Sequence, residues 1–307
     1  MTRIGRVSDT GRKLLGIIRA PFLLLVPACL APAFAIAWHH EGALDVGASA
    51  LVMMAALAAH IAVNALNEYQ DFRSGLDFDT VRTPFSGGSG TLVADHRFAP
   101  MALYVALAAL LVTSGIGAYF VVQLGSALIA PGLIGLAIIV AYTRWINRFP
   151  LLCLFAPGIG FGVLVINLTV LVLTGDMHNE ALWSSLLVTL LVSNLLLVNQ
   201  LPDVEADRRA GRRHLAIVWG EQWAARTVAL LLAATYLGVI AGWWLEVLPQ
   251  GALLALATAP LAVYVVCGVL RESRQLPNRF VRVMGCNVLV TLLTPVLLAL
   301  GWLIPAG

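Results

Sequence analysis

Residues 181–207 read ALWSSLLVTLLVSNLLLVNQLPDVEAD, an apolar run that passes without a break into three closely spaced acidic side chains. The run is long enough to cross the hydrocarbon core of a bilayer, because a spanning helix needs roughly 20 predominantly apolar residues. Charged side chains are costly inside that core, so the acidic end belongs at the membrane surface. The stretch therefore predicts a membrane helix that carries acid at one end.

The composition of the whole chain agrees with this interpretation. Of its 307 residues, 60% are hydrophobic and only 11% are charged, and the mean hydropathy is +0.89. A soluble globular domain carries about a quarter charged residues, because its surface faces water. These values exclude a soluble protein, and we attribute the net charge of +3 to membrane topology, with no nucleic-acid partner.

About nine segments are apolar and long enough to span a membrane. Because their apolar residues are continuous and do not alternate, helices are favoured over a β-barrel. We expect a single all-α domain over residues 1–307, a polytopic membrane protein whose first apolar segment is too long for a cleavable signal peptide. The predicted spans cover residues 14–38, 48–68, 98–122, 126–145, 151–174, 180–202, 222–245, 250–271 and 280–304.

The basic residues indicate the orientation of these spans. Four alternate connections, HHEGALDVG, QLGS, TGDMHNEA and EVLPQG, contain no Lys or Arg at all, although the chain has 19 of them. Because Lys and Arg concentrate in cytoplasmic loops, we expect a cytoplasmic N-terminus in the cell inner membrane. The four cysteines form no CxxC pair and lie in or beside apolar spans, so we interpret them as packing residues.

Eight acidic residues fall in two of the predicted cytoplasmic connections, and we expect them to converge on one site. They are Glu68, Asp71, Asp77, Asp79 and Asp95 in the first connection, and Asp203, Glu205 and Asp207 in the second. Helical residues three or four apart share a face. His60, Asn64, Asn67 and Asp71 therefore form one polar stripe, and Asn199, Asp203 and Asp207 form another, a parallel that hints at internal duplication.

Carboxylates four residues apart on a helix repel one another, so clusters of this kind need a cation. Carboxylate and amide oxygens are the ligands of hard cations, and Mg²⁺ typically binds through one or two carboxylates plus substrate phosphates. Two such clusters facing one another predict Mg²⁺ held around a diphosphate, with the active site facing the cytoplasm.

Two stretches resemble motifs of the UbiA superfamily of intramembrane prenyltransferases. Residues 64–77, NALNEYQDFRSGLD, are similar to its first acidic motif, and residues 203–216, DVEADRRAGRRHLA, to its second. Glu68 stands where the family commonly has Asp. The spacing around Asp71 looks most like the branch that prenylates 1,4-dihydroxy-2-naphthoate in menaquinone synthesis.

This resemblance implies the transfer of a polyprenyl group from a prenyl diphosphate to an aromatic acceptor by Mg²⁺-assisted ionisation. The catalytic acids would be Asp71, Asp203 and Asp77. The resemblance implies Mg²⁺ ligation by Asn67, Glu68, Asp71, Asp203 and Asp207. Candidate substrate-binding residues are His60, Asn64, Asn67, Arg82, Tyr142, Arg148, Asn199, Arg212 and Arg213.

Other interpretations stay open at this point. The acceptor can also be 4-hydroxybenzoate, homogentisate or another aromatic acid, and the same ionisation can lead to terpene cyclisation. A cation-coupled transporter is a further alternative, although its coupling sites usually lie near mid-bilayer, whereas these acids lie at span ends. Single residues also have ordinary roles: His60 as a core histidine, Arg82 in a flexible glycine-rich loop, and the other arginines as topology signals or lipid contacts.

Overall fold

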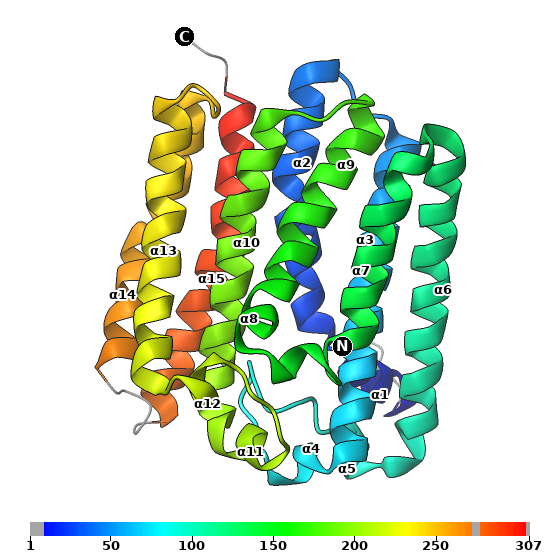
Figure 1. The fold of residues 1–307 in the computed structure, drawn as a ribbon, viewed down its shortest axis with the longest axis vertical. Coiled ribbons are helices and arrows are strands. Elements are labelled where there is room, and N and C mark those ends of the chain that lie inside the picture. The colour runs from blue at the N-terminus through cyan, green and yellow to red at the C-terminus, as the bar shows by residue number, and fades with distance from the viewer. Residues whose placement is uncertain (1–8, 272–276, 305–307) are drawn as a thin grey trace, which may run out of the picture.

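A computed structural model describes residues 9–271 and 277–304 of the chain. Within these ranges the regular elements are all helical, which confirms the predicted all-α class. Figure 1 shows the long helices standing side by side along the longest axis, with the short helices α4, α5, α11 and α12 gathered at one end. The protein is therefore a bundle with a distinct loop-bearing end.

The long elements follow the predicted spans. Their bounds are α2 (Leu25–Glu41, preceded by the 3₁₀ helix η1, Ala20–Leu24), α3 (Val46–Ser74), α6 (Ala99–Leu124), α7 (Ile129–Ala141), α8 (Pro150–Ile159), α9 (Val165–Thr174), α10 (Asn179–Gln200), α13 (Glu221–Trp244), the 3₁₀ helix η7 (Gln250–Thr258) continued by α14 (Ala259–Leu270), and α15 (Pro277–Trp302). Within the described residues, eight of these helical units are long and apolar enough to cross a membrane.

Short elements complete the loop-bearing end. They are α1 (Asp9–Ile17), α4 (Leu76–Asp79), α5 (Thr91–Ala94), α11 (Val204–Arg209) and α12 (Leu215–Val218), with 3₁₀ turns at His96–Phe98, Ile146–Arg148 and Leu201–Asp203. A further 3₁₀ turn, Ser126–Leu128, joins α6 to α7 at the opposite end (Figure 1). The predicted span 126–145 is a shorter apolar helical unit, Ser126–Ala141. It ends at the polar residues of the stretch YTRWINRFP, residues 142–150. The last residue of this stretch, Pro150, is the first residue of the next helix, a position that proline favours.

The first predicted span is interrupted near its start. Helix α1 ends at Ile17, and Arg19 adopts a left-handed backbone conformation with φ of 50° before η1 begins. A residue with a side chain rarely adopts this conformation. The predicted span 14–38 is therefore two elements joined at Arg19, and the membrane unit begins at Ala20.

Helix α10 lies at the centre of the bundle. It contacts α2, α8, α13 and α15, and 72% of its most apolar 18-residue window is buried inside the protein, the highest share among the candidate spans. Small and polar side chains such as Ser184, Thr189 and Ser193 allow neighbouring backbones to approach closely. The Asn194 Nδ2 donates to Asn287 Oδ1 at 2.6 Å, which ties α10 to α15.

Two core clusters pack around α10. One includes Leu197 and Val228, and the other includes Val188 and Ile36. Among the cysteines, Cys29 and Cys153 are buried as expected and Cys286 is half-buried. The prediction of a packing role is wrong for Cys267, which is exposed, because its position on α14 is not covered by another helix.

The irregular helix between α8 and α9 approaches α10 closely. Residues Gly160–Leu164 form a π turn, and Gly162 lies directly against Thr189 and Ser185. A Cβ atom at Gly162 would stand 2.7 Å from the Thr189 backbone nitrogen, closer than such atoms pack. Glycine at 162 therefore sets the distance between the α8–α9 unit and α10.

We expect Gly162→Val to lower stability by about 2 kcal/mol, because the added side chain forces the two helices apart. Gly160→Val is the matched control, since a Cβ at Gly160 meets no atom within 4 Å. Thermal unfolding of both purified variants measures the difference. An equal melting temperature for the two variants would contradict the close packing described above.

Candidate active site

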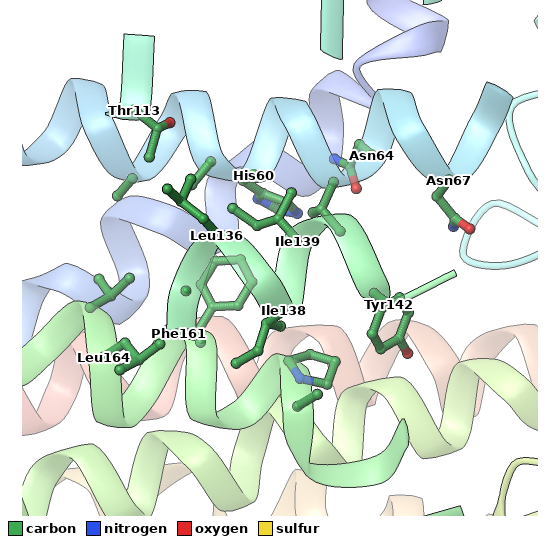
Figure 2. A pocket seen from close by; sticks show the side chains of 18 of the residues that line it. His60, Asn64, Asn67, Thr113, Leu136, Ile138, Ile139, Tyr142, Phe161 and Leu164 are labelled. Carbon is green, nitrogen blue, oxygen red and sulfur yellow. The ribbon is translucent and has the colours of Figure 1, made fainter. Parts of the chain in front are cut away.

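A cavity of about 870 Å³ opens among helices α3, α6, α7, α9 and α10. Most of its wall is apolar, with Val52, Leu136 and Phe161 among the lining side chains. Figure 2 shows His60, Asn64 and Asn67 on one side of it, with Tyr142 and Phe161 opposite. The cavity is thus an apolar chamber with a polar stripe along α3.

Four of the eight predicted acids line this cavity, and they come from both acidic stretches. Asp71 and Asp77 come from the first, and Asp203 and Asp207 from the second. The glycine at 75 makes this possible, because its φ of 83° ends α3 and turns the chain so that α4 places Asp77 beside Asp71. Helices α4 and α11 are in contact, which closes the acidic end.

The prediction that all eight acids converge is wrong for three of the other four. Asp95 is paired with Lys13 at 2.9 Å and with Arg97, while Glu205 is exposed and paired with Arg208 at 3.4 Å. Asp79 is exposed at the end of α4 and does not line the cavity. The fourth, Glu68, is buried behind the cavity wall. Spacing along the sequence does not reveal these positions, because ion pairs and burial in the folded chain decide them.

Arg212 joins the two acidic stretches. Its Nη2 donates to Asp71 Oδ1 in a short contact, and its Nη1 donates to Asp207 Oδ1 at 2.9 Å. His214 Nε2 lies 3.0 Å from the second Asp207 oxygen. Burial by itself lowers the pKa of Arg212, but the carboxylates of Asp71 and Asp207 outweigh it and raise that pKa, so the guanidinium stays charged.

Three oxygen atoms at the acidic end have no hydrogen-bond partner within the described residues. They are Asp77 Oδ2, Asp203 Oδ1 and Asn199 Oδ1, all of them buried. Burial, followed by repulsion from Asp71 and Glu68, raises the pKa of Asp77 to about 7. Leaving acceptors buried and unpaired costs free energy, and Mg²⁺, which binds through one or two carboxylates and keeps several waters, lowers that cost. The donor set therefore fits Mg²⁺.

Glu68 has a different environment from the other carboxylates. Its side chain is fully buried, and it accepts bonds from Arg19 Nη2 at 3.2 Å and from the Ser89 backbone nitrogen at 3.2 Å. The Ser89 hydroxyl makes a further short contact with it. Glu68 does not line the cavity, so its carboxylate holds Arg19 and the loop before α5.

Asn64 and Asn67 line the cavity and also hold neighbouring segments. Asn64 Nδ2 donates to the Ile18 carbonyl at 3.0 Å, which supports the left-handed turn at Arg19. Asn67 Oδ1 accepts from Thr143 Oγ1 at 3.1 Å, which links α3 to the connection after α7. Both amide side chains therefore also have a structural role.

His60 lies deeper in the cavity. It precedes Asp71 by eleven residues on α3, about 16 Å along the helix axis at 1.5 Å per residue. Its ring meets Phe161 edge to face with centroids 4.9 Å apart, and its Nδ1 has no partner within the described residues. His60 therefore faces the apolar chamber rather than the acidic end.

The other predicted substrate-binding residues divide into two groups. Tyr142, Asn199 and Arg212 line the cavity, whereas Arg82, Arg148 and Arg213 do not. The guanidinium of Arg82 packs against Gly90 instead, in the loop whose residues Ser86 to Gly88 do reach the cavity. The structure thus places the loop backbone, and not its arginine, at the site.

Several lining residues were not predicted. They are Arg19, Asn147, Gln200 and His214. The sequence does not single out Arg19, because a basic residue before an apolar span normally indicates only a cytoplasmic position. Its lining position depends on the left-handed turn and on Glu68, which no local pattern indicates. Gln200 follows Asn199 on the last turn of α10, where the polar stripe offered a usable signal.

We expect Glu68→Ala to lower stability by about 1–3 kcal/mol, because it leaves the half-buried Arg19 guanidinium and the Ser89 backbone nitrogen without their acceptor. Asp203→Asn is the comparison, and it should leave the melting temperature close to that of the parent, since it removes a buried charge that has an unpaired oxygen. Thermal unfolding in detergent checks both. Equal losses in the two variants would mean that Glu68 is not a structural acid.

Known proteins with similar sequences belong to one family of membrane enzymes. The profile of the UbiA prenyltransferase family matches residues 24–289. A 1,4-dihydroxy-2-naphthoate octaprenyltransferase from Bacillus subtilis (strain 168) is 30% identical over 196 residues, which cover 62% of this chain and 60% of that protein. The alignment with this relative therefore spans less than two thirds of either chain.

Solved structures share the fold. A digeranylgeranylglyceryl phosphate synthase superposes with a TM-score of 0.64 at 16% identity, covering 95% of this chain and 99% of that one. A UbiA homologue from Archaeoglobus fulgidus bound to DMAPP and Mg²⁺ superposes with a TM-score of 0.60 at 12% identity, covering 93% and 99%. At these identities the likeness concerns the arrangement of helices.

Proposed function

The chain belongs to the UbiA prenyltransferase family, and on that premise we propose that it transfers a polyprenyl group from a prenyl diphosphate to 1,4-dihydroxy-2-naphthoate, a step of menaquinone biosynthesis. The single observation that carries the proposal is the cavity: a charged end built from both acidic stretches opens into an apolar chamber. A prenyl diphosphate has the same division, with a polyanionic head and a hydrocarbon tail.

The diphosphate head belongs at the acidic end, together with Mg²⁺. Asp71, Asp77 and Asp203 would hold the metal, with the amide oxygen of Asn199 beside them. The metal supplies electrostatic neutralisation of the leaving diphosphate. The homologue from Archaeoglobus fulgidus, with DMAPP and Mg²⁺ bound, supports this assignment.

This ligand set revises the one expected from sequence. Glu68 leaves the set because Arg19 and Ser89 occupy its carboxylate. Asp207 also leaves it, because both of its oxygens are engaged by Arg212 and His214. Asn67 leaves it as well, because its Oδ1 accepts from Thr143 Oγ1. Asp77 enters it, since its buried Oδ2 has no partner within the described residues.

Arg212 and Arg19 give the site its positive groups. Both guanidinium groups line the cavity beside the acids, and in this position they can bind diphosphate oxygens. When the substrate's C–O bond breaks, the electron pair leaves with the diphosphate, and these cations stabilise the charge that develops there.

The apolar chamber has two tasks in this reaction. It holds the hydrocarbon tail, and it keeps water away from the allylic cation until the electron-rich ring of the acceptor attacks it. Phe161 and Tyr142 present aromatic rings to the chamber, where a ring face stabilises a cation. When the ring carbon that bears the carboxylate attacks the cation, its bond to the carboxylate breaks, CO₂ leaves and the electron pair of that bond restores the aromatic ring, so that no ring proton is lost.

The choice of acceptor rests on the Bacillus subtilis relative, which is a 1,4-dihydroxy-2-naphthoate octaprenyltransferase. The orientation rests on the basic residues described above, which favour a cytoplasmic active site in the inner membrane. The protein is a multi-pass membrane protein, and lipid surrounds the exposed apolar side chains of its outer helices, such as Leu111 and Val122 on α6.

The decisive experiment incubates the purified protein with labelled prenyl diphosphates and a panel of aromatic acids, followed by identification of the product by mass. We expect a prenylated, decarboxylated naphthoquinol precursor from 1,4-dihydroxy-2-naphthoate. Product from 4-hydroxybenzoate alone would replace the acceptor while retaining the reaction. Absence of product with every acceptor would overturn the proposal.

We expect Asp203→Asn to lower turnover by about a hundredfold or more, because it removes a charged ligand from the metal that faces the leaving group. Glu205→Gln is the matched control, since Glu205 lies two residues away but is exposed and outside the cavity. Initial rates at saturating Mg²⁺ separate the two variants. Normal turnover in Asp203→Asn would remove Asp203 from the metal site.

Chelation tests the metal directly. We expect EDTA to abolish product formation and added Mg²⁺ to restore it, because the unpaired carboxylate oxygens repel a diphosphate without a cation between them. The measurement is product yield against free Mg²⁺. Undiminished turnover in excess EDTA would contradict the role assigned to Asp71, Asp77 and Asp203.

A further inference from the structure

Three metal-binding side chains meet at the end of the bundle opposite the acidic cavity mouth. His40 lies in the last turn of α2, and His178 and Glu180 lie at the start of α10. One potential ligand atom from each lies within 4.8 Å of the other two. In Figure 1 the upper end of α2 stands beside the α9–α10 connection, far from α4 and α11.

The fold brings these residues together from distant parts of the chain. The imidazole rings of His40 and His178 stack with centroids 3.9 Å apart and an angle of 28° between their planes. His40 Nε2 lies 3.6 Å from Glu180 Oε1, too far for a good hydrogen bond but close enough for a shared ion. The three groups therefore converge without satisfying one another directly.

The neighbours of His178 favour the tautomer that a metal needs. The Thr174 hydroxyl donates to the Val170 carbonyl at 2.9 Å, so its oxygen is left to accept. That oxygen also accepts from the Asp176 backbone nitrogen at 3.2 Å, and His178 Nε2 lies 3.2 Å from it, at a distance where the tautomer protonated on Nε2 donates to it. In that tautomer Nδ1 keeps its lone pair for a metal, and Nε2 is oriented by a hydrogen bond, as in most histidine ligands.

We propose that His40, His178 and Glu180 bind a divalent transition metal of the Zn²⁺ type. Two imidazoles and one carboxylate are a recognised zinc ligand set, with the remaining position open to water. The donors differ from those of the cavity, where oxygen atoms alone suit Mg²⁺. The site thus takes a second and chemically different metal at the other end of the protein.

The proposed ion joins two segments that frame the cavity. Leu25 at the start of α2 and Thr169 on α9 both line the chamber, and α2 packs along α9. A metal between His40 and the His178–Glu180 segment ties the end of α2 to the start of α10. Its effect should therefore be on stability, because binding to the folded state alone raises the free energy of unfolding.

The experiment uses the full chain, free of any polyhistidine tag, purified in detergent and stripped with EDTA. Zinc content after dialysis against ZnCl₂ is measured by elemental analysis, and thermal unfolding is recorded with and without Zn²⁺. We expect one zinc per chain and a rise in melting temperature of about 5 °C at zinc concentrations well above Kd. Mg²⁺ at the same concentration should give no such rise at this site.

Variants assign the ion to these residues. His40→Ala and His178→Ala should each lose the bound zinc and the thermal shift. His96→Ala, an exposed histidine on the opposite end, should keep both. Asp203→Asn should also keep both, which separates this site from the acidic cavity and from the fate of the proposed activity.

Cobalt gives a second readout that does not depend on stability. Co²⁺ bound by two imidazoles and a carboxylate absorbs visible light, and this absorption should vanish in His40→Ala or, if that variant does not fold, in Glu180→Gln. The proposal is overturned if the parent binds no zinc after dialysis, or if zinc content and thermal shift survive unchanged in the histidine variants.

Discussion

The contact of Arg212 with Asp71 and Asp207 is the constraint on which the rest of the site depends. Two acidic stretches more than a hundred residues apart cannot approach in a low-dielectric bundle unless a cation lies between them. The guanidinium provides that cation from within the chain, and its fork geometry reaches one carboxylate with each arm. The two acidic stretches are thereby held next to each other before any ligand binds.

This contact also explains why the acids are not equivalent. Asp207 interacts with Arg212 and His214, and Glu68 accepts hydrogen bonds from Arg19 and Ser89. Both carboxylates therefore have structural roles. Asp77 and Asp203 each keep a buried oxygen with no partner within the described residues. A buried carboxylate oxygen without a partner lowers the stability of the fold but is available to bind a metal. Functional sites commonly contain such locally unfavourable groups.

The same helices present different chemistry at their two ends. Oxygen donors gather where α3 and α10 run into the loop-bearing end, and imidazoles gather where α2 ends beside the α9–α10 connection. The apolar middle cannot hold ions, because charge is costly in the hydrocarbon region. The two candidate sites are therefore separated by the chamber that would hold the substrate's tail.

Sequence alone determined the membrane class, the positions of the nine apolar helical segments and the two acidic stretches, because hydrophobic length and helical spacing are local properties. It did not determine which carboxylates face the cavity. The left-handed turn at Arg19, the turn at Gly75 and the reach of Arg212 across 141 residues to Asp71 place those side chains. Only tertiary packing decides such partners, since a carboxylate's role depends on which cation lies next to it in space.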